Sequence, residues 1–264
     1  MTKRTDRQFL TEVAYADGGR LTDRAALYDF QRPRIDLVGE AITALGAIEG
    51  QLVVDVGCGT GQYLSALDGA GAIVIALDLS AGMLGSVTSA GWSRVAADAT
   101  WLPFASGSAD AVLMMHMLYH VPEPPVAVRE ARRVLRPGGR LLVTTAGDRH
   151  LAEMNAAWLG VLDELRVRGD LQELSLVNNM FPPREARALL GASFESVTER
   201  RLTAPVVVPD PGPVLRHAAS TAAAHTSTRD NPEVIDRMEA HVASVIAREG
   251  SFRTTSDTAL FVAR

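Results

Sequence analysis

Three glycines at alternate positions, Gly57, Gly59 and Gly61, follow an apolar run in the segment VVDVGCGTGQ, residues 53–62. Glycine permits a positive φ and lets a ligand approach the backbone with no Cβ in the way. A helix that begins after Gly61 would direct its free N–H groups into the same crevice. This loop predicts a ligand site beyond the carboxyl ends of parallel strands.

Two carboxylates near the loop indicate the kind of ligand. Asp78 ends the next apolar run, where a carboxylate can accept hydrogen bonds from ribose hydroxyls. The dinucleotide fingerprint G-x-G-x-x-G would need a third glycine at residue 62, but that residue is Gln62. Asp55 stands two residues before the first glycine and suits a ligand with an ammonium group better than one with a pyrophosphate. A nucleoside ligand other than a nicotinamide dinucleotide is favoured.

Short apolar runs that alternate with helical segments must position these residues. The runs are QLVVDVG (51–57), AIVIALD (72–78), SRVAAD (93–98), ADAVLMMHM (109–117) and RLLVTTA (140–146). Each is too short for a globular helix, and several are continuously apolar, as strands buried on both faces are. Strands alternating with helices indicate βαβ units, so we expect an α/β protein with a doubly wound parallel sheet.

After residue 147, short apolar runs and helical segments no longer alternate regularly. Helices are predicted over 150–169, 182–192 and 232–249, and strands over 194–202 and 257–264. We expect the two strands to join the same sheet. Segments of about 148–180 and 203–250 would then cover its carboxyl edge as a cap.

Composition and charge exclude several classes of protein. Of the 264 residues, 47% are hydrophobic and 22% charged, which is typical of a globular chain and not of a disordered or collagen-like one. The net charge of −5 provides no basic footprint for long nucleic acids. One cysteine permits no internal disulfide, and the sequence has neither a secretory signal nor a run of roughly 20 apolar residues. We therefore expect a cytoplasmic protein with no nucleic-acid or membrane partner and no metal site.

Five motifs in order resemble those of class I S-adenosylmethionine-dependent methyltransferases, in particular the methyltransferase-11-like group that acts on small molecules. They are VVDVGCGTG (53–61), LDLSAGML (77–84), AADATWLPFASGSADAV (96–112), LMMHMLYHVPEP (113–124) and LRPGGRLL (135–142). The resemblance covers about residues 50–147 and the closing strands. It implies a Rossmann-like seven-stranded sheet with an antiparallel last strand. It also implies a helical lid over residues 1–49 before a core of residues 50–264, and S-adenosylhomocysteine as the product.

The resemblance assigns roles in cofactor binding to matching positions. It implies that the methionine part of the cofactor is cradled by Asp55, Gly57, Gly59 and Gly61, and that Asp78 holds the ribose. Leu79 and Met83 would line the adenine pocket, and Asp98 and Ala99 would read the adenine edge. His116 would lie under the sulfonium. Cys58 belongs to the same loop, as a small buried residue and not a nucleophile. Plainer interpretations stay open, with Asp78 as a helix-capping acid, Met83 as core packing and Asp98 as a solvated turn residue.

Residues near the methyl group are expected from the same comparison. His120 matches the second histidine of a His-His-x-Pro-like pattern and is the candidate general base, with Tyr119 beside it as a substrate contact. Tyr28 and Arg34 would reach the cofactor carboxylate from the lid. Alternatively, His120 caps its loop and Arg34 lies on a solvated face. Asn178, Phe181 and His217 are candidates for the wall of a substrate pocket in the cap.

The function expected from the resemblance is methyl transfer to an oxygen, nitrogen or carbon atom of a small molecule, with a role in secondary metabolism by family analogy. Three alternatives remain. The chain could methylate a peptide, protein or RNA, could use S-adenosylmethionine for non-methylating chemistry, or could bind the cofactor without turnover. The sequence leaves the acceptor and the oligomeric state open.

Overall fold

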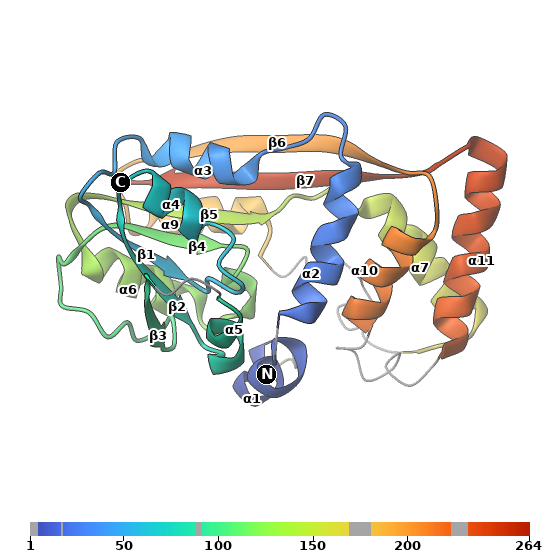
Figure 1. The fold of residues 1–264 in the computed structure, drawn as a ribbon, viewed down its shortest axis with the longest axis horizontal. Coiled ribbons are helices and arrows are strands. Elements are labelled where there is room, and N and C mark those ends of the chain that lie inside the picture. Colours follow the sequence, from blue (N-terminus) through green and yellow to red (C-terminus); the bar gives the residue numbers. More distant parts are fainter. Residues whose placement is uncertain (1–4, 17, 88–90, 169–180, 223–231) are drawn as a thin grey trace.

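A seven-stranded sheet with the order β3-β2-β1-β4-β5-β7-β6 forms the centre of the protein. The computed structural model describes residues 5–16, 18–87, 91–168, 181–222 and 232–264 (Figure 1). The strands are β1 (Leu52–Val56), β2 (Ile73–Asp78), β3 (Ser93–Ala96), β4 (Ala109–Met115), β5 (Leu135–Ala146), β6 (Val197–Val208) and β7 (Phe252–Ala263). The first five run parallel, and β7 runs antiparallel to both β5 and β6. The expected fold, with its antiparallel last strand, is confirmed.

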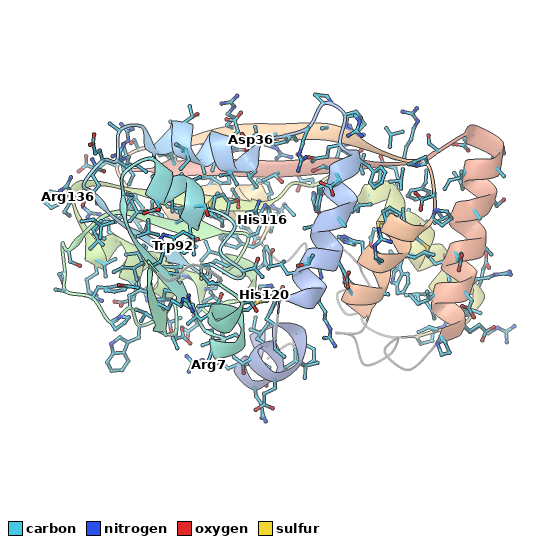
Figure 2. The ribbon with its side chains drawn as sticks, in the orientation of Figure 1. Arg7, Asp36, Trp92, His116, His120 and Arg136 are labelled. Atoms are coloured by element: carbon cyan, nitrogen blue, oxygen red, sulfur yellow. The ribbon has the colours of Figure 1, made fainter. Side chains whose placement is uncertain are left out.

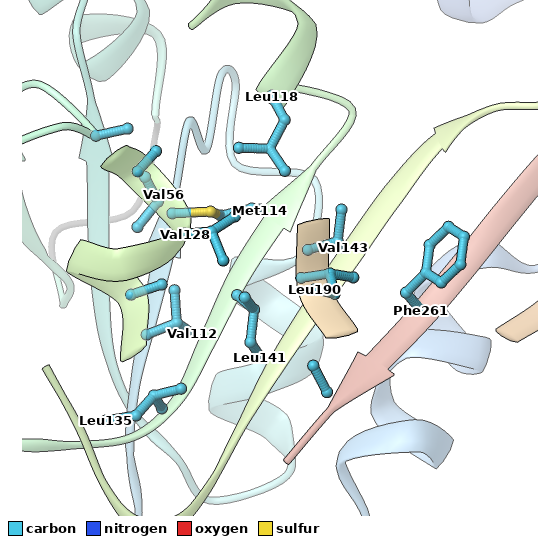
Figure 3. Packing of buried hydrophobic residues seen from close by; sticks show 14 of the residues in the cluster. Val56, Val112, Met114, Leu118, Val128, Leu135, Leu141, Val143, Leu190 and Phe261 are labelled. Carbon is cyan, nitrogen blue, oxygen red and sulfur yellow. The ribbon is translucent and has the colours of Figure 1, made fainter. Parts of the chain in front are cut away.

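Helices cover both faces of this sheet, because neighbouring strand residues point to opposite sides. Val53 and Leu113 pack on one face with α3 (Leu37–Leu45), α4 (Leu64–Gly69) and α5 (Ala81–Ser86). On the other face, Val112, Leu141 and Phe261 pack against α6 (Pro124–Val134) and α9 (Pro183–Gly191), as Figure 3 shows. These two apolar layers hold the carboxyl ends of the strands in fixed positions.

The last two strands are longer than the sequence predicts. Strand β6 continues to Val208 instead of ending at 202, and β7 begins at Phe252 instead of 257. Strand β5 leaves the sheet at the pair Ala146 and Thr258, whereas β6 and β7 remain paired to Val208 and Phe252. Pro205 argues against a central strand in the sequence, but β6 is an edge strand, which tolerates proline.

The two-stranded extension of β6 and β7 carries a third apolar cluster. Helices α7 (Ala152–Glu164), α10 (Gly212–Ala222) and α11 (Pro232–Glu249) gather at this end of the molecule (Figure 1). Trp158, Met238 and Phe252 are buried there with Leu27 from the N-terminal segment. In the described part of the chain, no helix combines the length and apolar character needed to cross a bilayer.

The N-terminal segment connects the core to this outer cluster. It contains α1 (Arg7–Phe9), η2 (Leu10–Ala14), α2 (Gly19–Ala25) and η3 (Ala26–Phe30). In Figure 1, α1 lies beside α5, whereas α2 stands between the core and α10. The hydroxyl of Ser80, the N-cap of α5, donates to the carbonyl oxygen of Tyr15 at 2.8 Å, which fixes one end of the segment.

A short loop after β5 is bound tightly to β7. The N–H groups of Gly147 and Leu151 donate to the carbonyl oxygens of Asp257 and Thr255, at 2.8 and 2.6 Å. The Asp257 carboxylate lies against Gly147 and accepts hydrogen bonds from Arg201, at 2.6 Å, and from the Arg149 N–H, at 3.2 Å. This anchoring determines where the loop places its one histidine, residue 150.

Replacing Gly147 by alanine should destabilise the protein by about 1–3 kcal/mol, because the new Cβ would overlap with the Asp257 carboxyl and the Arg201 guanidinium. Gly160→Ala is the matched control, since Gly160 lies in α7 with open space where its Cβ would be. That variant should gain about 0.5–1 kcal/mol from helix propensity. Urea unfolding measures both, and an unchanged Gly147→Ala midpoint would contradict the close packing.

Candidate functional site

A cavity of about 1220 Å³ lies at the carboxyl ends of β1, β2 and β4, and is bordered by the N-terminal segment, the loop after β5 and α10. It brings together most of the residues that the sequence singled out. Those that line it are Tyr28, Arg34, Asp55, Gly57, Cys58, Gly59, Asp78, Leu79, Met83, Asp98, Ala99, His116, Tyr119 and His120, and also His217. In Figure 2, His116 and His120 lie between the core and α2.

The glycine loop forms one wall of the cavity. Gly57 and Gly59 have φ values of 74° and 55°, so side chains there would be strained. A Cβ on Gly57 would also lie 2.9 Å from the Cβ of Met117. Gly61 differs from the expectation, because it does not line the cavity. Its open side faces Leu64, whose Cδ1 would be 2.8 Å from an added Cβ.

Asp78 connects β2 to the glycine loop. Its Oδ2 accepts a hydrogen bond from the Gly59 N–H at 2.9 Å, and its Oδ1 accepts one from the Ser80 N–H at 2.8 Å. Burial raises the pKa of Asp78, and these N–H groups oppose that rise. The cap of α5 is Ser80 and not Asp78, because the Ser80 hydroxyl accepts from the Met83 N–H. Asp78 therefore supports the loop and also lines the cavity.

Asp55 at the end of β1 is the most unusual charge in the site. The residue is 1% exposed, and its Oδ2 is buried with no hydrogen-bond partner. Burial, and next the charge of Asp78, raise the pKa of Asp55 to about 7. A buried carboxylate oxygen without a partner is costly unless a donor or cation reaches it. The ammonium group of S-adenosylmethionine is such a donor, so the residues present fit this cofactor.

Asp98, which the resemblance assigns to the adenine edge, already bonds to other residues of the protein. The Oδ1 of Asp98 accepts from the Thr100 N–H at 2.7 Å, and its Oδ2 pairs with Arg7 of the N-terminal segment. Met83 is 1% exposed, so it packs in the core and also lines the cavity. Burial raises the pKa of the Cys58 thiol, as do the neighbouring carboxylates, which keeps it protonated.

His116 follows β4 in a conformation that is rare for a residue with a side chain. Its φ is 52°, and its N–H donates to the Thr144 hydroxyl at 2.9 Å. Backbone strain of this kind is found mainly at functional sites. Burial lowers the pKa of His116 to about 4, with a smaller contribution from His150, so the imidazole is neutral at neutral pH.

His120 is linked to two residues that the sequence analysis did not single out. The hydroxyl of Tyr15 lies 2.8 Å from His120 Nε2, and Arg24 Nη1 donates to the same hydroxyl at 3.2 Å. The guanidinium of Arg24 also stands 5.6 Å from the Tyr15 ring centre. Because the arginine can only donate, the Tyr15 hydroxyl proton is available to His120, which would place the imidazole proton on Nδ1.

Tyr28 and Arg34 have different surroundings although both come from the lid. The Tyr28 hydroxyl lies 3.0 Å from His150 Nε2, and burial raises its pKa. Arg34 is 74% exposed and pairs with Asp29 at 3.3 Å. Tyr28 therefore belongs to the inner wall, whereas Arg34 lies at the rim, already bound to an acid.

The candidates for the cap have three different outcomes. His217 of α10 is buried and lines the cavity. Phe181 instead packs in the core, where its carbonyl oxygen accepts from the Thr145 hydroxyl at 2.6 Å. Asn178 lies outside the described residues. Within those residues, no group of three or more histidine, cysteine or acidic side chains could hold a metal ion.

Tyr15, Arg24 and His150 were missed by the sequence reasoning. His150 had a usable signal, because it follows the fifth strand, and residues beyond the carboxyl ends of parallel strands meet at one edge. Tyr15 and Arg24 had no such signal in the sequence, since the N-terminal segment reaches the cavity through its packing on α5 and α10.

Comparisons with known proteins agree with this architecture. A family model described as a methyltransferase domain matches residues 54–143. The demethylmenaquinone methyltransferase of Clavibacter sepedonicus is 34% identical over 201 residues, which is 69% of this chain and 81% of that protein. The enzyme of that name from Renibacterium salmoninarum is 39% identical over 134 residues, which is 45% of this chain and 56% of that protein. The chain therefore spans little more than half the length of some relatives that it matches.

Solved structures with low sequence identity share the fold. Phosphoethanolamine N-methyltransferase 2 of Haemonchus contortus, in complex with phosphomonomethylethanolamine and S-adenosylhomocysteine, has a TM-score of 0.59 at 16% identity and covers all of this chain and 60% of its own. The YcgJ protein of Bacillus subtilis has a TM-score of 0.57 at 17% identity, over 85% of this chain and 96% of its own.

The sheet order and the glycine loop define an α/β protein of the Rossmann-like class with a ligand site at the carboxyl edge. The family model that matches the chain, and the relative that is covered over four-fifths of its length, identify the family within this class. It belongs to the methyltransferase-11 family of class I S-adenosylmethionine-dependent methyltransferases.

Replacing Asp55 by asparagine should stabilise the ligand-free protein. Because the folded-state pKa is raised from 3.8 to about 7, the native state keeps its proton longer than the unfolded chain, and stability falls as pH rises between these values. Asparagine carries no charge, so its advantage in melting temperature should grow from pH 5 to pH 8. Asp68→Asn, at an exposed position in α4, is the control and should show no such trend. An Asp55→Asn variant less stable at pH 8 than at pH 5, relative to the parent, would contradict the unpaired charge.

Proposed function

We propose that this chain transfers the methyl group of S-adenosylmethionine to a small-molecule acceptor. The observation that carries the proposal is that one cavity joins the glycine loop, with Asp55 and Asp78, to a second wall of Tyr15, Tyr28 and His120. The first wall is suited to a cofactor that contains an ammonium group and a ribose. The second offers aromatic and hydrogen-bonding groups to another molecule in the same space.

The residues would act mainly by placement. The bound cofactor supplies an already activated methyl group, so that orientation of the acceptor can contribute roughly 7–11 kcal/mol to lowering the barrier. Asp55 and Asp78 would hold the ammonium and ribose ends. The N-terminal segment, which we assign as a lid over residues 1–49, would exclude water through its contacts at Ser80 and Asp98.

His120 is the proposed general base for an acceptor that must lose a proton. Because Nε2, the nitrogen without a proton, accepts from Tyr15, the imidazole is held in one orientation. The proton of the acceptor would therefore reach His120 through the Tyr15 hydroxyl, which gives its own proton to Nε2 as it takes the new one. The Arg24–Tyr15 pair ties the lid to this histidine, so closure of the lid and orientation of the base would be coupled. Tyr119, whose ring centre is 4.6 Å from that of His120, would contact the acceptor.

The acceptor class is a finer proposal. Relatives named demethylmenaquinone methyltransferases make a quinone-type ring the first acceptor to test. Oxygen, nitrogen and carbon nucleophiles and a role in secondary metabolism remain part of the proposal. We also propose a cytoplasmic protein with no nucleic-acid partner, in line with its net charge of −5.

Methyl-labelled S-adenosylmethionine tests the activity directly. The protein is incubated with the labelled cofactor and an extract of its host, and the products are separated into acid-insoluble and small soluble fractions. We expect a new labelled compound in the soluble fraction. Label in the precipitate would indicate a protein or RNA acceptor. Tight cofactor binding without transfer would favour non-methylating chemistry or a binding protein.

Replacing His120 by alanine should lower turnover by about 10²–10⁴-fold, the usual contribution of a positioned general base. Affinity for S-adenosylhomocysteine should stay within about twofold, because His120 belongs to the proposed acceptor wall. His241→Ala, at an exposed position in α11, is the control and should match the parent in both respects. Unchanged turnover in His120→Ala would mean that the base lies elsewhere or is not needed.

A further inference from the structure

Two histidines beside Tyr28, the half-buried His150 and the buried His217, have tautomers that their backbone partners determine. The N–H of Asp257 can only donate, and it lies 3.1 Å from His150 Nδ1, so that this nitrogen is the acceptor. The carbonyl oxygen of Arg24 can only accept, and it lies 3.3 Å from His217 Nδ1, so that this nitrogen carries the proton. The two neutral imidazoles therefore present opposite Nε2 atoms, a donor in His150 and an acceptor in His217.

Both imidazoles remain neutral over the ordinary pH range. Burial lowers the pKa of His150 to about 4, and the neighbouring His217 adds to this effect. Burial also lowers the pKa of His217 to about 4, against the hydrogen bond to the Arg24 carbonyl. The tautomers inferred from the backbone contacts are therefore those present at neutral pH.

The Nε2–H group of His150 determines which partner donates in the hydrogen bond between His150 and Tyr28. Its Nε2–H donates to the Tyr28 hydroxyl at 3.0 Å, which leaves the tyrosine proton free for another acceptor. Tyr28 lines the cavity, and its ring stands edge-on to that of His217, with centres 6.4 Å apart. In the described part of the chain, His217 Nε2 has no hydrogen-bond partner. One O–H donor and one nitrogen acceptor are thus presented to the same cavity.

The surroundings of this pair select against positive charge. Arg24 acts electrostatically on both Tyr28 and His217. No carboxylate of the described residues forms a hydrogen bond or ion pair with the side chains of Tyr28 or His217. The adjoining parts of the chain contribute apolar residues to the cavity wall, namely Leu21, Ala25 and Leu151. A cationic amine held by Tyr28 and His217 would lose its water beside Arg24, with no carboxylate bonded to either side chain, while Asp29 and Asp55 lie elsewhere on the wall of the cavity.

We propose that Tyr28 and His217 bind the hydroxyl group of an uncharged, ring-containing methyl acceptor. Tyr28 donates a hydrogen bond to the hydroxyl oxygen, and His217 Nε2 accepts one from the hydroxyl proton. His150 is a positioning residue, which acts through Tyr28. This assignment rests on the proposed function, since it names the acceptor class of the same cavity. It favours hydroxylated rings over amines.

Three naphthalene probes test the assignment without turnover. The full chain is saturated with S-adenosylhomocysteine and titrated with 2-naphthol, with 2-methoxynaphthalene, which cannot donate, or with 2-naphthylmethylamine, which is cationic at pH 7. We expect 2-naphthol to bind about tenfold more tightly than either of the others, a difference of about 1.4 kcal/mol. Equal affinities, or no binding of 2-naphthol, would overturn the proposal.

Two substitutions at residue 217 distinguish the loss of the acceptor nitrogen from a general effect on the fold. In His217→Asn the amide can still donate to the Arg24 carbonyl, but the acceptor at Nε2 is lost, so the preference for 2-naphthol should disappear. His217→Gln can place an amide oxygen near the Nε2 position and should keep most of the preference. Tyr28→Phe should weaken 2-naphthol and 2-methoxynaphthalene equally, because both carry an oxygen that accepts. His241→Asn is the control.

The outcomes also separate this site from the cofactor site and from the proposed activity. A loss of S-adenosylhomocysteine affinity in His217→Asn equal to the loss for 2-naphthol would assign the residues to the cofactor and overturn the proposal. Selective 2-naphthol binding in a protein that transfers no label would contradict methyl transfer and support the hydroxyl site.

Discussion

The site depends on one buried carboxylate that the protein does not neutralise. Asp55 ends β1, where its Oδ2 has no partner and Asp78 adds a second negative charge nearby. Such a pair of acids is unfavourable in the ligand-free chain, because burial without a counter-charge costs free energy. A ligand that brings an ammonium group relieves the cost. The glycine loop, whose backbone bonds to Asp78 and to the end of β2, keeps the space for that ligand open.

The second constraint is the long hairpin of β6 and β7. Because these strands remain paired beyond the end of β5, they hold the outer helices against the edge at which the parallel strands end. The same extension supplies Asp257 and Thr255, which anchor the loop carrying His150. A structural feature at the edge of the sheet thus determines the hydrogen bonds that reach the far wall of the cavity.

The sequence predicts the core more fully than the site. Continuous apolar runs and the glycine loop locate β1, β2 and β4, and with them Asp55 and Asp78, because local pattern and burial agree there. The sequence did not predict the full length of β6, because that strand contains Pro205, and a strand tolerates proline only at the edge of a sheet. Gly61 was assigned to the ligand by spacing, whereas packing turns it toward Leu64. Tyr15 reaches His120 across 105 positions of sequence, a contact that no periodicity can signal.

The most direct test of the central interaction is proton exchange on binding S-adenosylhomocysteine, measured by calorimetry at pH 7 in buffers of different ionisation enthalpy. With a pKa of about 7 in the ligand-free state, Asp55 is about half protonated, and pairing with an ammonium group should expel that proton. We predict release of about half a proton per molecule bound, absent in Asp55→Asn. Proton uptake, or the same release in the variant, would contradict the account.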